Sequence, residues 1–201
     1  MFYMSVESPA SRGRILESAR QEILASGVIG LRVSAVAKSA KTSIPLIYKY
    51  FGDRDGLLTE VLGQIYAEFN AEDIKNSKMW LVKNAGKLLS GPEIVDLFPN
   101  PFGEHIRERR LWILRIVAAS LDLPKLRHKL EEIHEEADRE FDEVIAEIHS
   151  LIEDRKHFSP KVLRSVFRGL SFGHIFTEFN YDNRPTDHEW RELIIFLLKN
   201  T

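Results

Sequence analysis

The ten residues Thr42–Phe51 constrain the fold of this chain more than any other stretch. Ser43 precedes Pro45 by two positions, an order typical of a helix that begins with a side-chain cap and has a proline in its first turn. Ile47 and Phe51 lie four residues apart, so they share one face of that helix. The segment therefore predicts a short helix with one apolar, anchored face.

The opposite face of this short helix carries Tyr48, Lys49 and Tyr50. Phenol and ammonium groups donate hydrogen bonds to phosphates, and apolar edges such as those of Ile44 and Pro45 can touch a thymine methyl. The face therefore predicts contact with DNA. The alternative is that Tyr48 and Tyr50 are half-buried and pack on the first helix, because aromatic side chains are most often part of a core. We favour packing for Tyr50 and DNA contact for Tyr48 and Lys49.

A longer pattern of apolar, glycine and cap residues surrounds this segment. The residues that carry it are Ile15, Ala19, Ile23, Gly27, Val36-Ala37, Ala40-Lys41-Thr42-Ser43, Ile47-Tyr48-Lys49-Tyr50-Phe51 and Arg54-Asp55-Gly56-Leu57-Leu58. With this pattern, residues 15–58 resemble the DNA-binding domain of the TetR (tetracycline-repressor) family of bacterial transcriptional regulators. The resemblance implies an all-α fold of about nine helices. In that fold, a three-helix helix-turn-helix head is followed by a helical-bundle body that binds a ligand and dimerises.

The resemblance also implies which residues of the head meet DNA. They are Arg32, Lys41, Thr42, Ser43, Ile44, Pro45, Tyr48, Lys49, Tyr50 and Arg54. Thr42 and Ser43 would hold a phosphate at the start of the recognition helix, and Arg54 would clamp the DNA backbone from outside the groove.

Two positions of the head depart from the family pattern. Lys41 stands where the family usually has glycine, and a positive φ there would cost on the order of 1 kcal/mol. Arg32 stands where the family usually has a Thr or Ser cap, and arginine cannot accept the capping hydrogen bond. We therefore expect the second helix either to begin later, at Ser34, or to be capped by water.

Composition and charge are consistent with a DNA-binding head on a globular body. The whole chain has a formal net charge of −2, but residues 1–56 hold eight basic and five acidic residues and the remainder is acidic. The absence of cysteine excludes disulfides and favours a reducing compartment. No signal peptide or membrane-length apolar run is recognised, so a cytoplasmic location is expected.

Periodic apolar residues predict helices along most of the chain and no strand. The expected helices span residues 11–26, the short stretch from Val33 to Ala40, the recognition segment, a fourth helix capped by Asp53, a weakly patterned region at 71–90, and residues 107–121, 125–153, 160–180 and 187–199, the last capped at Thr186. The expected domains are a tail at 1–10, the helix-turn-helix domain at 11–56 and the effector-binding and dimerisation domain at 57–201.

Two sets of body residues are candidates for sites that the resemblance implies. The expected effector pocket, suited to an apolar or aromatic ligand, comprises Trp80, Phe98, Phe102, Trp112, Arg115, Phe141, Phe172 and Phe176. The expected dimer seam comprises Phe167, Leu170, Ser171, His174, Trp190, Ile194 and Leu197. For both sets the alternative is ordinary packing within one chain.

The leading functional hypothesis is a ligand-responsive repressor that binds a palindromic operator as a homodimer and is released by a small, largely apolar effector. It is not an enzyme and needs no cofactor. One alternative keeps the fold but makes the protein an activator or an architectural DNA-binding protein without a ligand. Another is a helical metalloenzyme built on Glu131 and His134, but the partner Glu-x-x-His motif that a di-iron centre needs fails at His149 and His174.

Overall fold

The computed structural model describes residues 9–97, 100–151 and 183–200, together with residues 159, 161, 162, 165, 166, 169, 173 and 179. Every regular element among these residues is a helix. The all-α class is therefore confirmed for this part of the chain. The expected helix at 160–180 falls largely outside the described residues, so the expected total of about nine helices stays a prediction.

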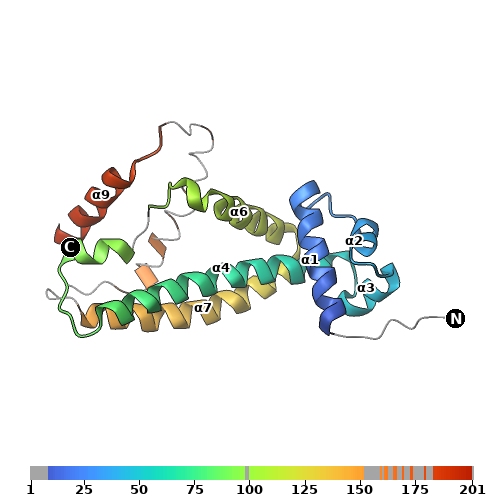
Figure 1. Ribbon diagram of the computed structural model, residues 1–201, viewed down its shortest axis with the longest axis horizontal. Coiled ribbons are helices and arrows are strands. Elements are labelled where there is room, and N and C mark those ends of the chain that lie inside the picture. The colour runs from blue at the N-terminus through green and yellow to red at the C-terminus, as the bar shows by residue number, and fades with distance from the viewer. Residues whose placement is uncertain are drawn as a thin grey trace. The chain divides into compact units, whose positions relative to one another are not determined.

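The first three helices share a core. They are α1 (Pro9–Ser26), α2 (Val33–Ser39) and α3 (Ile44–Phe51), and Figure 1 shows them grouped together. Apolar side chains at helical spacing form the shared core, including Ile15, Ala19, Ile23, Val36, Ala37 and Ile47. The first helix begins at Pro9, two residues before the expected start, while the tail residues 1–8 lie outside the described part.

The fourth helix is longer than the sequence pattern predicts. α4 (Arg54–Asn84) runs without a break through the region expected to be a separate, weakly patterned helix. Ile74 and Leu81 are 6% and 4% exposed, so its buried side continues into this region. No glycine or proline interrupts the chain between Gly63 and Gly86, and Gly86 adopts a positive φ of 75° just after the helix ends.

The remaining helices lie close to their expected positions. They are α5 (Gly91–Ile94), the 3-10 turns η1 (Val95–Leu97) and η2 (Glu104–Ile106), α6 (Arg107–Asp122), α7 (Pro124–Ser150) and α9 (Asp187–Asn200). α5 lies in a stretch that the sequence predicts to be loop. It begins at a capping box, in which the Glu93 carboxylate accepts hydrogen bonds from the backbone N–H and the hydroxyl of Ser90, at 2.8 and 2.7 Å.

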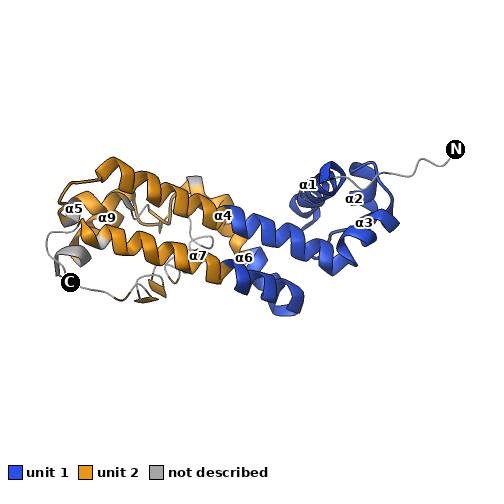
Figure 2. Ribbon diagram, turned by 90° about the horizontal axis from the view of Figure 1, so that it is seen from below, with its two compact units in different colours: residues 1–68, 115–133 blue, residues 69–114, 134–201 orange. Residues whose placement is uncertain are grey.

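The chain divides into two compact units, coloured in Figure 2. The first unit comprises residues 1–68 and 115–133, and the second comprises residues 69–114 and 134–201. The first unit therefore holds α1 to α3 together with the beginnings of α4 and α7 and the end of α6. The expected functional boundary between residues 56 and 57 is a different division and stays a prediction.

α4 and α7 lie side by side within each unit. In the first unit, Gly63 of α4 leaves room for Lys129 and Ile133 of α7, whose side chains would lie 3.0 and 3.8 Å from a Cβ at that position. In the second unit, the Lys78 ammonium of α4 donates a hydrogen bond to the Glu140 carboxylate of α7 at 2.7 Å. Among the described residues, no helix is long and apolar enough to span a bilayer.

The second unit has a separate apolar cluster near its C-terminal helix. Val95, Trp190 and Ile194 are buried together, and the Phe102 ring meets the Trp190 ring edge-on at 5.9 Å.

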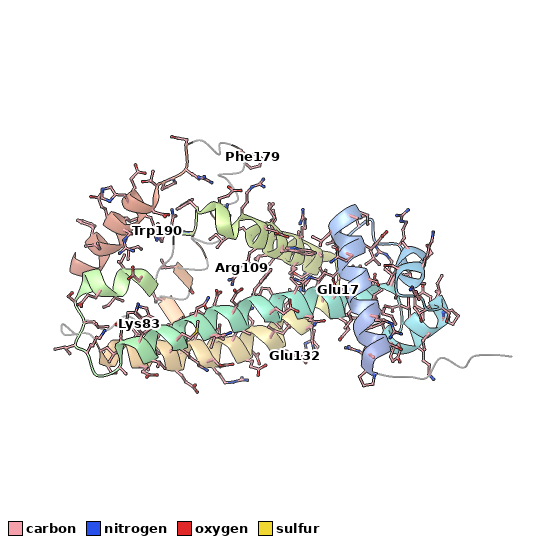
Figure 3. The ribbon with its side chains drawn as sticks, in the orientation of Figure 1. Glu17, Lys83, Arg109, Glu132, Phe179 and Trp190 are labelled. Carbon is pink, nitrogen blue, oxygen red and sulfur yellow. The ribbon has the colours of Figure 1, made fainter. Side chains whose placement is uncertain are left out.

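A polar contact joins α6 to α4 in the same unit. Arg109 of α6 extends to α4 (Figure 3) and donates a hydrogen bond to Asp73 at 2.8 Å. These contacts hold α5, the first part of α6 and α9 within the second unit.

Candidate nucleic-acid interface

The recognition segment folds into α3 as its local signals predict. The Ser43 hydroxyl oxygen accepts a hydrogen bond from the backbone N–H of Leu46 at 3.3 Å, and Pro45 lies in the first turn. The helix ends at Gly52, whose φ of 80° is accessible to glycine at little cost. The predicted cap and proline are therefore confirmed, and they set both the start and the direction of this helix.

The two faces of α3 have different environments. Leu46, Ile47 and Phe51 are buried, with Ile47 completely inaccessible to solvent. On the other side Ile44 is 37% exposed and Tyr48 42% exposed, and the side chain of Lys49 is also exposed. The structure therefore places Tyr48 and Lys49 on the outward face, where a duplex could reach them.

Tyr50 lies between these two faces. It is half-buried, and its ring centroid lies 6.1 Å from that of Phe51. This placement agrees with the packing that we favour for Tyr50. The structure does not test whether its phenol also reaches DNA.

The turn before α3 contains the one non-glycine residue with positive φ among the described residues. Lys41 has a φ of 51°. Glycine adopts such a positive φ at little cost, which explains why it is common at this position in the family that the segment resembles. The backbone N–H of Thr42 donates to the carbonyl of Ala37 at 2.9 Å and closes the turn between α2 and α3. Lys41 and Ser43 are exposed and Thr42 is half-buried, so all three lie beside the start of α3.

The start of α2 resolves the question raised by Arg32. The helix begins at Val33 with Arg32 as its N-cap residue, and no side chain accepts a capping hydrogen bond there. The alternative start at Ser34 was therefore wrong. The Arg32 guanidinium lies across α1 instead, with Nε 3.0 Å from an oxygen of Glu22, and 72% of its side chain remains exposed.

Asp53 and Arg54 fix the corner between α3 and α4, and Asp53 does so with its carboxylate. One Asp53 oxygen accepts a hydrogen bond from the backbone N–H of Gly56 at 2.6 Å, which confirms the predicted cap, and the other accepts from Lys125 of α7 at 2.8 Å. The Lys125 ammonium, followed by the Gly56 N–H, holds the pKa of Asp53 below its usual value. The Asp53 carboxylate in turn raises the pKa of Lys125.

Arg54 lies at the start of α4, as the sequence predicts, and its side chain contacts another part of the head. Its guanidinium donates to the backbone carbonyls of Leu31, Val28 and Ile29, at 3.1, 3.2 and 2.8 Å. These groups belong to the loop between α1 and α2. The predicted DNA clamp is thus a side chain already engaged within the head.

Contacts between distant segments complete the head and could not be read from sequence spacing. Arg12 pairs with Glu60 of α4, and its guanidinium carbon lies 5.3 Å from the centroid of the Phe51 ring. Arg20 pairs with Glu68 at 2.8 Å. Each partner lies 48 residues from its arginine, and no local pattern marks the pairing.

The structure describes five of the eight predicted pocket residues. Trp112 is buried, Trp80 and Phe141 are half-buried, and Arg115 is exposed and lies in the first unit. Phe102 packs on Trp190 in the C-terminal cluster. Phe98, Phe172 and Phe176 lie outside the described residues.

A shallow depression of about 490 Å³ on α4 and α7 is lined by none of the predicted pocket residues. Its walls are formed by Ala71, Ile74, Lys75, Lys78, Met79, Val82 and Glu140. The predicted pocket therefore stays a prediction.

The predicted dimer seam is likewise described only in part. Trp190 and Ile194 are each 4% exposed and pack on Val95 of their own chain, so packing within one chain accounts for both. Phe167, Leu170, Ser171 and His174 lie outside the described residues, as does the side chain of Leu197. α9 nevertheless keeps an exposed apolar side, with Leu193 46% and Phe196 62% exposed.

The metalloenzyme alternative gains no support from the described part of the chain. Glu131 lies 3.8 Å from His128 as an ion-pair neighbour on the same helix. Within the residues that the structure describes, no three His, Asp or Glu side chains gather as metal ligands would.

Comparison with known proteins identifies the head. A family model of bacterial regulatory proteins of the tetR family matches residues 15–61. Over this segment the chain is similar to the TetR family. The match covers the recognition helix, the turn at Lys41 and the first two turns of α4, which are the elements just described. The resemblance seen in the sequence is thereby confirmed.

Proteins similar to this chain include a curated repressor and several solved structures. The HTH-type transcriptional repressor NicS of Pseudomonas putida (strain KT2440) is 33% identical over 69 residues, which are 34% of this chain and 32% of the repressor. The match therefore spans about a third of that relative's length.

A TetR-family regulator structure from Mesorhizobium loti is similar with a TM-score of 0.65 and 16% identity, covering 96% of each chain. The transcriptional regulator FadR from Bacillus subtilis, solved in complex with stearoyl-CoA, has a TM-score of 0.56 and 18% identity, covering 93% of this chain and 97% of FadR. At these identities the likeness concerns the fold.

Proposed function

We propose that this protein is a ligand-responsive transcriptional repressor that binds a palindromic operator as a homodimer. The observation that carries the proposal is the division of α3 into a buried face and an outward face with Tyr48 and Lys49. A short helix fixed in this way by a cap, a proline and a buried anchor can present the same side chains to every operator. The NicS match supports the repressor role.

The residues around α3 fall into groups according to the type of contact that each can make with DNA. Lys41, Thr42 and Ser43 surround the start of the helix, where backbone N–H groups and the helix dipole favour a phosphate. Tyr48 donates to a phosphate, and Lys49 contacts a base edge or a phosphate. Ile44 and Pro45 contribute apolar contact. Arg32, most of whose side chain is exposed at the start of α2, contributes a further phosphate contact.

A homodimer follows from the chemistry of operator recognition and from α9. A helix-turn-helix dimer reads two half-sites about one helical turn or a multiple apart. α9 buries Trp190 and Ile194 in its own chain but leaves Leu193 and Phe196 exposed. Burial of this outer side against a second copy would remove apolar surface from water.

The effector is proposed to be a small, largely apolar molecule that favours a conformation with wrongly spaced recognition helices. FadR, whose fold is similar, was solved with stearoyl-CoA, a ligand with a long apolar chain. The described members of the predicted pocket are rich in aromatic side chains, which suits such a ligand.

The proposal is tested by salt-titrated binding to DNA. The protein is titrated onto a duplex from the region upstream of its own coding sequence, beside Lys49→Ala and Tyr48→Phe. Neutralised phosphates release counterions, so the logarithm of the association constant should fall linearly with the logarithm of the salt concentration. We expect both variants to weaken binding, and Lys49→Ala to reduce the salt slope by about one if Lys49 contacts a phosphate.

A matched control is Lys83→Ala, which removes an exposed cation from the far end of α4 in the second unit. It should leave binding unchanged. Absence of specific binding by folded wild-type protein on every fragment of the surrounding locus would contradict the proposed function.

A further inference from the structure

The guanidinium of Arg54 is the meeting point of three backbone carbonyls. Nε donates to Leu31, and one terminal nitrogen donates to both Val28 and Ile29. The other terminal nitrogen lies 3.7 Å from an oxygen of Asp55. Nε and one terminal nitrogen are therefore hydrogen-bonded within the protein itself, and the other terminal nitrogen makes only the longer ion-pair contact with Asp55.

The loop that supplies these carbonyls has a shape that few sequences allow. Gly27 has a φ of 77°, and a Cβ at Gly30 would lie 2.2 Å from the carbonyl oxygen of Ser26. The loop therefore turns tightly between α1 and α2. Its carbonyls point inward to Arg54, and the Ile29 side chain is left 96% exposed at the tip.

Loss of the arginine would remove the three side-chain hydrogen bonds that this loop receives from α4. Carbonyl groups that are partly buried and unpaired are unfavourable, so the loop would have to rearrange until water reached them. Val33, the first residue of α2, follows Leu31 by two positions, and α2 packs directly on α3. Displacement of the loop would therefore reach the recognition helix through α2.

We propose that Arg54 is a positioning residue for DNA recognition, which ties the start of α4 to the α1–α2 loop and does not itself bind phosphate. The inference rests on the proposed function only for its DNA-binding consequence. The structural tie can be measured without DNA. It replaces the phosphate clamp that the sequence predicts at this position.

The variant Arg54→Lys distinguishes a residue that positions the loop from one that binds a phosphate. Lysine keeps the charge, so a phosphate clamp would retain nearly normal affinity and salt slope. A single flexible ammonium lacks the planar guanidinium group that donates to three carbonyls at once, so lysine cannot hold the loop as arginine does. We expect Arg54→Lys to bind the upstream duplex about tenfold more weakly with an unchanged salt slope.

Amide hydrogen exchange of the free protein provides the second readout. For Arg54→Lys we expect exchange at residues 27–32 to become about tenfold faster, because local opening exposes those amides. Lys49→Ala serves as the matched control. It should weaken DNA binding but leave exchange in this loop as in the wild type.

Normal loop exchange together with normal affinity in Arg54→Lys would overturn the inference. A salt slope lowered by about one in Arg54→Met, again with normal loop exchange, would identify Arg54 as a phosphate clamp and would also overturn it. If wild-type protein binds no DNA, the proposed function fails and the recognition role fails with it. Loop exchange then still shows whether Arg54 holds the loop.

Discussion

At the scale of single residues, Lys41 shows how the head combines folding and recognition. A φ of 51° is unfavourable for a side chain with a Cβ, by about 1 kcal/mol. Unfavourable backbone conformations persist where the surrounding structure enforces them, often at functional sites. The turn that contains Lys41 also orients α3, and a cation there lies beside the start of the recognition helix. We infer that the charge offsets the strain by contacting a phosphate.

Lys41→Gly should stabilise the protein and weaken DNA binding. Removing the Cβ relieves the left-handed conformation, so the free energy of unfolding should rise by about 0.5–1 kcal/mol in denaturant titrations. Lys41→Ala is the control, since it removes the charge and keeps the Cβ. It should weaken DNA binding similarly without the gain in stability. A lower free energy of unfolding for Lys41→Gly would contradict this reading of the turn.

At the scale of helices, the local signals of the sequence predicted starts and ends well. The caps at Ser43, Asp53 and Thr186 are confirmed, the last as a capping box in which Thr186 and Glu189 exchange hydrogen bonds at 2.8 and 3.2 Å. These signals act over three residues, within reach of sequence reasoning. The short helix α5 was missed because Gly91-Pro92 is typical of a loop.

Contacts between distant segments could not be predicted in the same way. Lys125 lies 72 residues from Asp53 in the chain, and Arg54 reaches back more than 20 residues to the α1–α2 loop. Many lysines could have paired with Asp53, and only the packing of α7 on α4 selects this one. The contacts of Arg54 were missed for the same reason, because the carbonyls that accept its hydrogen bonds come from another element.

The pKa shift of Asp53 makes a prediction about acid stability. Because the folded-state pKa lies below the unfolded value of about 3.9, the stabilisation by this carboxylate is complete above that pH. It is lost as the pH falls through the lower pKa of the folded protein. Asp53→Asn can still accept the Gly56 N–H but does not titrate. Its free energy of unfolding should therefore fall less steeply than that of the wild type between about pH 5 and about pH 2.

The control for this measurement is Asp55→Asn, which removes a neighbouring exposed carboxylate. Urea denaturation at a series of pH values gives the slopes for all three proteins. The same slope for Asp53→Asn and wild type would show that the Lys125 contact does not persist in solution.

At the scale of the whole molecule, the account requires two copies of the chain. Phe196→Glu places a charge on the exposed apolar side of α9, so it should shift the protein to a monomer in sedimentation experiments. Val82→Glu makes the same chemical change at a side chain of α4 that is 79% exposed, and it should leave the dimer intact. A dimeric Phe196→Glu protein would place the interface elsewhere.

The central claim is that two recognition helices of a symmetric dimer read one operator, and hydroxyl-radical footprinting tests it most directly. We expect two protected patches on one face of the duplex, centred about one helical turn or a multiple apart. Both patches should disappear together in Lys49→Ala, which changes only the outward face of α3. A single patch, or a footprint that persists in Lys49→Ala and Tyr48→Phe alike, would contradict the account.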